Sequence, residues 1–278
     1  MQSLPETDMR AEAIRLVGAA AGTGLSIRLV GGVAVALRCP IYSALPGLAR
    51  SYQDIDLVGL RKESGALRAL MEDLEYVPDR RFNAVHGATR LVFMDEKTGL
   101  QVDVFLDVFK MCHKLNLIDR LAIDSWSLPL ADLILTKFQI VHMNTKDIQD
   151  SYALLLEHTV GDDESGINAR YMACLCASDW GWYTTTMDRI TALSSDVPIF
   201  VQDPELQSLV RARLAKIQDA LEHEPKSGRW RLRSKLGRRV RWYELPEEKS
   251  LDLLGKRTLE ECAPETREER APSDAYRG

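Results

Sequence analysis

Hydrophobic and polar residues change their spacing several times in the N-terminal part of the chain. Residues 9–21 carry apolar side chains at helical spacing, which predicts an amphipathic helix. Residues 25–30 then alternate as a strand does, until Gly31 and Gly32 interrupt the pattern. The apolar run at residues 33–37 predicts a second helix. The expected order is therefore helix, strand, glycine pair and helix.

Strand-like patterns continue in the next part of the chain. Residues 54–60 alternate between apolar and polar positions. Residues 91–94 and 100–105 flank a turn-like stretch, which predicts a β-hairpin. We therefore predict the α+β class, with a small mixed sheet in a domain that spans residues 1–125.

Helical periodicity replaces these strands in the second half of the chain. Apolar residues recur at helical spacing, with interruptions in the third segment, over residues 130–143, 146–158, 166–193 and 204–221. These segments predict that a helical domain, residues 126–225, follows the mixed-sheet domain.

A strongly basic segment comes next, in a chain whose formal net charge is −5. Residues 226–241 hold eight basic residues and no acidic residue. Four of the basic side chains lie at alternate positions: Arg229, Arg231, Arg233 and Lys235. Period two predicts a hairpin-like segment, residues 226–245, with one basic face. Such a face can bind RNA phosphates, or it can be a solvated face that acidic residues elsewhere neutralise.

Composition narrows the class of protein. The chain has 278 residues and a hydrophobic content of 45 %, enough for a substantial core. No apolar run has membrane-spanning length and the N-terminus does not resemble a signal peptide, so we expect a cytoplasmic protein without a membrane partner. The five cysteines form no CxxC pair, which disfavours a disulfide framework or a zinc site. Residues 246–278 predict an acidic, partly disordered tail.

Two carboxylates on one predicted strand are the first candidate site residues. Asp54 and Asp56 flank Ile55, so both side chains point to the same face of the strand. Asp103, on the second strand of the predicted hairpin, can complete a set of three. Carboxylate oxygens are the ligands that Mg²⁺ prefers, and such a set can hold one or two ions. Taken alone, these aspartates are also typical of a solvent-facing strand.

The glycine pair adds a second candidate feature. Two glycines between a strand and a helix let the backbone approach a phosphate, with the N–H groups of the helix directed at it. Gly31 and Gly32 also fit an ordinary tight turn, because no longer glycine-rich phosphate motif follows them. The combination of the glycine pair with the aspartates favours a nucleotide site.

These residues resemble a known family. The core motif of the polymerase-β-type nucleotidyltransferase superfamily, GG…R-S/T-x-DID, resembles residues 31–37 (GGVAVAL), Arg50-Ser51 and residues 54–57 (DIDL). Two later motifs of its AbiEii-like branch resemble residues 132–137 (DLILTK) and 146–150 (KDIQD). AbiEii-like proteins are the toxins of type IV toxin–antitoxin and abortive-infection systems.

The resemblance implies a nucleotidyltransferase domain at the N-terminus and an activity. The enzyme would transfer a nucleoside monophosphate from an NTP to a hydroxyl of RNA, such as tRNA, or of a protein, releasing pyrophosphate. Asp54 and Asp56 would hold the metal bound to the triphosphate. Asp103 would help to hold a second Mg²⁺ and could take the acceptor's proton, and Ser51 either contacts a phosphate or is a simple loop serine. An antitoxin protein is an implied partner.

Lys137 provides an argument that is independent of the resemblance. It falls in the middle of an apolar stripe at helical spacing, where a leucine would be expected. A lysine there either reaches the edge of the stripe, forms a structural ion pair, or binds an anion such as a nucleotide phosphate. Asn144 can cap the next helix with Asp147 in its first turn, and Lys146 with Asp150 fits an i,i+4 pair. Only the resemblance makes Asp147 a candidate catalytic residue.

Two other functions remain open from the sequence. Enzymes that modify small molecules such as aminoglycosides resemble the same superfamily core, although the basic segment argues against this alternative. A catalytically silent scaffold could instead bind nucleic acid through residues 226–241. The aromatic run at residues 179–183 (DWGWY) is interpreted as core and turn rather than as a platform for stacking bases.

Overall fold

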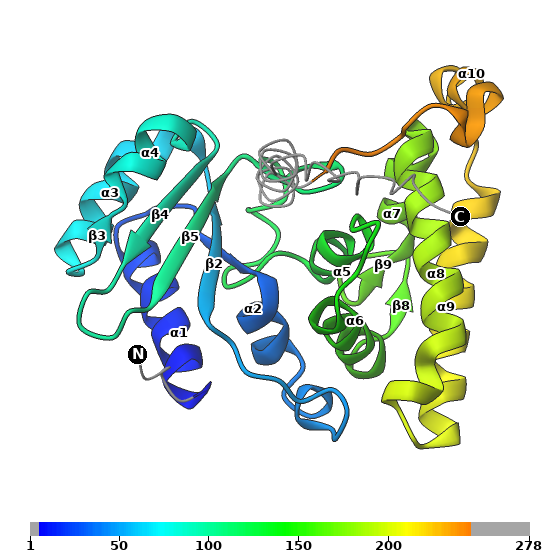
Figure 1. Ribbon diagram of the computed structural model, residues 1–278, viewed down its shortest axis with the longest axis horizontal. Helices are drawn as coiled ribbons and strands as arrows, with labels where there is room; N and C mark the ends of the chain where they lie inside the picture. Colours follow the sequence, from blue (N-terminus) through cyan, green and yellow to red (C-terminus); the bar gives the residue numbers. More distant parts are fainter. Residues whose placement is uncertain (1–5, 246–278) are drawn as a thin grey trace, which may run out of the picture. The chain divides into compact units, whose positions relative to one another are not determined.

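The computed structural model of the protein describes residues 6–245 (Figure 1). Helix α1 (Glu6–Gly22) is followed by strand β1 (Arg28–Val30), helix α2 (Gly31–Arg38) and strand β2 (Asp54–Gly59). This is the order that the hydrophobic pattern predicts. Helix α2 begins at Gly31, directly after Val30, whose backbone is extended.

The central sheet has five strands in the order β1-β2-β5-β4-β3. The predicted hairpin forms strands β4 (Arg90–Met94) and β5 (Gln101–Leu106), which pair antiparallel. Strand β2 pairs with β1 antiparallel and with β5 parallel, so the sheet is mixed. The structure therefore confirms the α+β class and the small mixed sheet.

Several short elements lack a clear sequence pattern and were not expected. Between β2 and β4 the chain forms helix α3 (Ser64–Asp73), the edge strand β3 (Val77–Pro78) and helix α4 (Arg80–His86). After β5 it forms a second, small hairpin from β6 (Val108–Lys110) and β7 (Lys114–Asn116). Strands of two or three residues are too short to show alternation.

The second half is helical, as predicted, but its helices begin and end at different residues. The helices are α5 (Leu130–Phe138), α6 (Thr145–Glu157), α7 (Ala169–Ser178), α8 (Trp180–Phe200) and α9 (Pro204–His223). A short two-stranded sheet, β8 (Val160–Gly161) and β9 (Ile167–Asn168), lies between α6 and α7. Asp179 divides the predicted third helix, since its carboxylate accepts hydrogen bonds from the first N–H groups of α8.

The hairpin predicted for residues 226–245 is wrong. Residues Gly228–Leu236 form helix α10, which Ser227 caps through a hydrogen bond from the N–H of Trp230. The placement of basic residues at every second position is therefore not a sign of strand pairing here. In a helix, residues two apart point about 200° away from each other, so the four basic side chains do not share one face.

One hydrophobic core runs through both halves of the described chain. It includes Leu16 of α1, Ile55 of β2, Leu133 of α5 and Leu214 of α9. Helix α2 contacts β2 on one side and α5 and α6 on the other, so it lies between the sheet and the helices (Figure 1). The boundaries predicted at residues 125 and 225 stay predictions, and the predicted tail, residues 246–278, lies outside the described residues.

Candidate active site

The three predicted carboxylates meet on the central sheet. Asp56 of β2 pairs in register with Asp103 of β5, and Asp54 lies two residues earlier on the same face of β2. The nearest carboxylate oxygens of Asp54, Asp56 and Asp103 all lie within 4.8 Å of one another. Asp54 is exposed, Asp56 is half-buried and Asp103 is buried. We call these three residues the aspartate triad.

Crowding of like charges makes the triad unfavourable without a cation. Burial, together with the neighbouring charges of Asp54 and Asp103, raises the pKa of Asp56 to about 8. Partial desolvation and the charge of Asp103 raise the pKa of Asp54 as well. The folded chain thus concentrates negative charge at one point, which a divalent cation would neutralise.

Asp103 offers an uncommitted ligand atom. Its Oδ2 accepts hydrogen bonds from the guanidinium of Arg90 at 2.8 Å and from the side-chain amide of Gln101 at 3.0 Å. Its Oδ1 is buried and has no hydrogen-bond partner among the described residues. A buried carboxylate oxygen without a partner is costly, and a hard cation is a natural partner for it. The triad therefore fits a Mg²⁺ site.

Each glycine of the pair makes room for one charged side chain. Gly31 has a φ of +73°, and a Cβ there would lie 2.0 Å from Oδ2 of Asp56. A Cβ on Gly32 would lie 1.9 Å from the guanidinium of Arg50. The pair therefore places the Asp56 carboxylate beside the first turn of α2, where the helix dipole favours negative charge.

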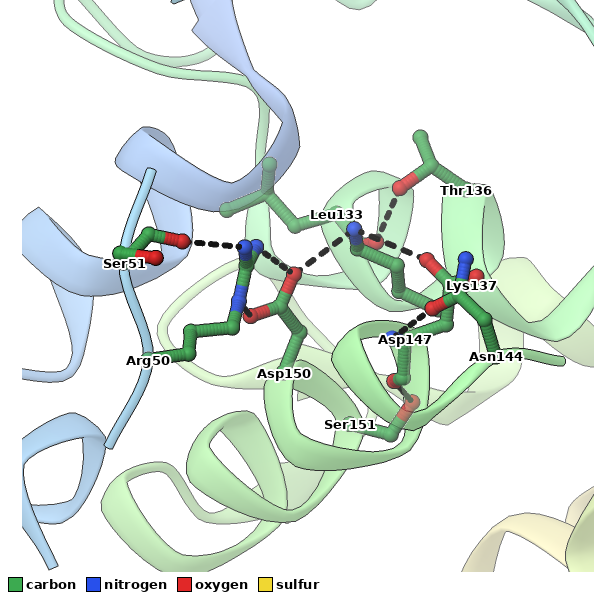
Figure 2. A network of polar contacts seen from close by, with 9 residues as sticks. All are labelled: Arg50, Ser51, Leu133, Thr136, Lys137, Asn144, Asp147, Asp150 and Ser151. Atoms are coloured by element: carbon green, nitrogen blue, oxygen red, sulfur yellow. Dashed lines mark hydrogen bonds and ion pairs between the residues drawn. The ribbon is translucent and has the colours of Figure 1, made fainter. Parts of the chain in front are cut away.

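Arg50, Lys137, Asp147 and Asp150 form a buried network (Figure 2). Its Arg50 packs against Gly32 of the glycine pair. The guanidinium of Arg50 donates two hydrogen bonds to the carboxylate of Asp150, at 2.9 and 2.8 Å. Nζ of Lys137 lies 2.8 Å from Oδ2 of Asp150 and 3.4 Å from Oδ1 of Asp147. This network joins the loop before β2 to helices α5 and α6.

Lys137 is buried, as its place in the apolar stripe predicts, and it forms an ion pair. Burial alone would lower its pKa, but Asp150 and Asp147 more than offset this and raise the pKa above the ordinary value. The positive charge of Lys137 also lowers the pKa of Asp56, so the lysine lies within electrostatic reach of the triad. Of the alternatives open from the sequence, the structural ion pair is present, and a role in binding phosphate remains a prediction.

The predictions for the motif that contains Asp147 are confirmed only in part. The side chain of Asn144 accepts a hydrogen bond from the N–H of Asp147 at 2.9 Å, which confirms the predicted cap. The predicted pair of Lys146 with Asp150 is wrong, because Asp150 is buried against Arg50 and Lys137. Lys146 is exposed on the first turn of α6, where its charge lowers the pKa of Asp54. Asp147 lies in the network rather than in the triad.

The remaining predicted residues do not join the triad. Ser51 is exposed, and its backbone carbonyl accepts a weak hydrogen bond from Arg50 at 3.4 Å. Arg233 donates to the carbonyls of Gly237 and Val240, which commits it to the fold of its own segment. Arg229, Arg231 and Lys235 are exposed on α10.

Sequence reasoning missed the partners of the predicted residues. Arg90 starts β4 and lies diagonally across the hairpin from Asp103. The hairpin register alone could have indicated this contact, since residues two apart on a strand share a face. No local pattern could have paired Arg50 with Asp150, which lie 100 positions apart.

No helix in the described part of the chain combines the length and the apolarity needed to cross a bilayer. No protein-family model and no curated protein matches the sequence. Among solved structures, the chain is similar to the solution structure of the antibiotic-resistance factor ANT(2'')-Ia, with 15 % sequence identity and a TM-score of 0.37. The match covers 79 % of this chain and 97 % of that chain.

Proposed function

We propose that the protein is a Mg²⁺-dependent nucleotidyltransferase that moves a nucleoside monophosphate from an NTP to a hydroxyl group. The aspartate triad carries the proposal: three carboxylates from two adjacent strands converge, and one buried oxygen has no partner among the described residues. The glycine pair lets the Asp56 carboxylate and the Arg50 guanidinium pack against the first turn of α2. The motif resemblance assigns the same residues to this chemistry.

Asp54, Asp56 and Asp103 would hold one or two Mg²⁺ ions. Bound Mg²⁺ would neutralise the triphosphate and the charge that develops at the α-phosphate. Oδ1 of Asp103 would be a buried ligand, Asp56 a half-buried one, and exposed Asp54 would face the nucleotide. Oδ1 is the only oxygen of Asp103 that is free of described partners, so it can serve the cation or accept the proton of the acceptor, but not both at once. We assign it to the cation.

The reaction balances without any redox partner. The oxygen of the acceptor hydroxyl forms a bond to the α-phosphorus, and the bond from that phosphorus to the bridging oxygen of the β-phosphate breaks. Pyrophosphate leaves, and the proton of the hydroxyl passes to a base or to water. Most of the catalysis in such a transfer comes from positioning and from neutralising charge.

Two cationic side chains lie within electrostatic reach of the triad, Arg50 from the loop before β2 and Lys137 from α5. Lys137 and Arg50 influence the pKa values of the triad carboxylates, and both are held in place by Asp150. We propose that Lys137 contacts the triphosphate while it stays paired with Asp150. We assign Asp147 to positioning Lys137, because it lies 3.4 Å from Nζ.

The acceptor is proposed to be RNA, such as tRNA, or a protein hydroxyl. The resemblance to AbiEii-like toxins further suggests a cytoplasmic toxin that an antitoxin protein restrains. A small-molecule acceptor of the aminoglycoside type is the alternative within the same chemistry, and the acceptor that becomes labelled would distinguish the two.

Label transfer tests the reaction class. The protein is incubated with Mg²⁺, total RNA and each NTP in turn, labelled at the α-phosphate or at the γ-phosphate. The proposal predicts covalent label on an acceptor from one or more α-labelled NTPs and none from any γ-labelled NTP. Transfer of the γ-label would indicate a kinase, and the absence of transfer to RNA, protein and aminoglycoside acceptors would contradict the proposal. Substitution of Asp56→Asn serves as the inactive control.

A further inference from the structure

A cavity of about 480 Å³ lies outside the candidate active site. It opens where the start of α8, helix α10 and residues 241–244 meet the turn between β6 and β7. No residue of the triad or of the buried network lines it. Two kinds of side chain dominate its wall, indoles and guanidiniums: Trp180, Trp230, Trp242, Arg229, Arg233 and Arg241.

The aromatic wall is fixed by the fold. The indole N–H of Trp242 donates to Oγ1 of Thr185 at 3.0 Å, and its ring meets Trp180 edge to face with centroids 6.1 Å apart. Gly181 allows this approach, because a Cβ there would lie 2.7 Å from the carbonyl oxygen of Trp242. Nε1 of Trp230 is buried without a hydrogen-bond partner among the described residues. The fold thus holds the aromatic surface of the cavity in place.

The charged side chains that line the cavity present mainly positive charge to a ligand. Arg229 and Arg241 are exposed and form no ion pair with any of residues 6–245. The two acidic residues of the wall are engaged elsewhere. Asp179 accepts the N–H groups of the first turn of α8, and Glu244 forms an ion pair with Lys110 at 2.6 Å. An anionic ligand would therefore meet two arginines without paired carboxylates.

We propose that this cavity binds a nucleotide unit of a single-stranded polynucleotide. A base would stack on the indole rings, and the phosphates on either side would meet Arg229 and Arg241. Stacking on aromatic side chains beside a cationic groove is how proteins hold single strands. A duplex would not fit this chemistry, because its base faces are stacked on one another. Trp180 and buried Trp182 both line the cavity, and the proposal gives Trp180 a stacking role that the interpretation of residues 179–183 as core and turn did not include.

This inference rests on the proposed function, because it specifies the acceptor of the transfer as a single-stranded polynucleotide. Its test needs no catalysis. Binding of fluorescein-labelled 12-nucleotide oligo(U) and oligo(dT) to the full chain is measured by anisotropy without NTP and without Mg²⁺. The two oligonucleotides decide between RNA and DNA. A failure of nucleotidyl transfer and a failure of strand binding are thus separate results.

Two matched double variants locate the binding. Arg229→Gln with Arg241→Gln removes two charges that line the cavity, whereas Lys235→Gln with Arg239→Gln removes two exposed charges of the same segment that do not. We expect the first pair to weaken binding at least tenfold and to reduce the slope of log K against log salt by about 1.4, and the second to weaken it less than threefold. Both pairs change exposed side chains, and thermal unfolding verifies that both remain folded.

An abasic oligomer of the same length tests the stacking. It should bind about tenfold more weakly than oligo(dT), because it keeps the phosphates and lacks the bases. Equal losses of oligonucleotide affinity in the two double variants would show diffuse charge attraction and would overturn the proposal. Equal affinity for the abasic oligomer, or for an acidic peptide of the same net charge, would overturn it as well, and so would the absence of binding to both oligonucleotides.

Discussion

At the residue scale, the site depends on close packing of charged groups against glycine backbone. Asp56 and Arg50 occupy the space that a side chain at Gly31 or Gly32 would fill. The glycine pair therefore has a structural function that can be measured apart from any nucleotide. It sets the distance between the triad and the first turn of α2.

Substitution of Gly31→Ala should disrupt both stability and activity. The new Cβ would lie 2.0 Å from the Asp56 carboxylate, at a φ of +73° that alanine rarely adopts. We expect a loss of at least about 2 kcal/mol of unfolding free energy from strain and overpacking. Gly18→Ala, in α1 with no atom within 4 Å of the new Cβ, should be neutral or stabilising. Chemical denaturation of the two variants measures the difference, and similar values would contradict the close packing.

Asp56 should destabilise the metal-free protein as pH rises. Its pKa is about 8 in the folded chain and about 3.9 when unfolded. Between these values the folded state binds more protons, so the free energy of unfolding falls as pH increases. In EDTA at pH 8.5, Asp56→Asn should therefore be more stable than the wild type by about 1 kcal/mol or more, and it should abolish transfer. A stability difference that does not change between pH 5 and pH 8.5 would argue against the charge crowding.

At the element scale, the alternation of residues 54–60 and of the hairpin predicted both the sheet and the meeting of Asp54 and Asp56 on one face. Placing Asp103 beside Asp56 required the parallel pairing of β2 with β5, which no local pattern shows. The hairpin predicted at residues 226–245 was wrong because alternation of arginine with apolar residues fits a short capped helix as well. Local pattern thus found the elements that carry the site, but not the long-range contacts that complete it.

The network between the loop before β2 and helices α5 and α6 should respond strongly to the loss of one carboxylate. Asp150→Asn leaves Arg50 and Lys137 buried without their shared partner. Removing one member of a buried pair costs about 3–5 kcal/mol. The control is Asp188→Asn, which breaks a largely exposed pair with Arg238 and should cost about 1 kcal/mol or less. Urea denaturation measures the loss of unfolding free energy in both variants, and equal losses would show that the network is solvated.

The hairpin of β6 and β7 should make the protein sensitive to acid. Burial lowers the pKa of His113 to about 4, and the charges of Asp179 and Glu244 offset this only in part. Unfolded histidine titrates near 6.5, so between about pH 6.5 and 4 the unfolded state binds more protons and stability falls as pH decreases. The loss should reach about 3 kcal/mol. The His113→Gln variant should lack this part of the acid dependence. If its free energy of unfolding changes with pH as that of the wild type does, the prediction is contradicted.

At the scale of the whole molecule, the sheet supplies the triad, and the nearby cations come from both halves: Arg50 from the loop before β2 and Lys137 from α5. The core that runs from α1 to α9 and the pair of Arg50 with Asp150 hold these two halves in register. A nucleotide bound at the triad would thus lie against groups from both halves. The proposed chemistry depends on the triad being a metal centre.

Anomalous diffraction from crystals grown with Mn²⁺ and a non-hydrolysable NTP analogue would show whether the triad binds metal. We expect one or two anomalous peaks between Asp54, Asp56 and Asp103, about 2.1–2.3 Å from their oxygens, with the analogue's phosphates in contact with the same ions. Crystals of Asp56→Asn should lack these peaks. An analogue bound elsewhere, with its metal away from the triad, would show that the triad is not the metal centre of the reaction.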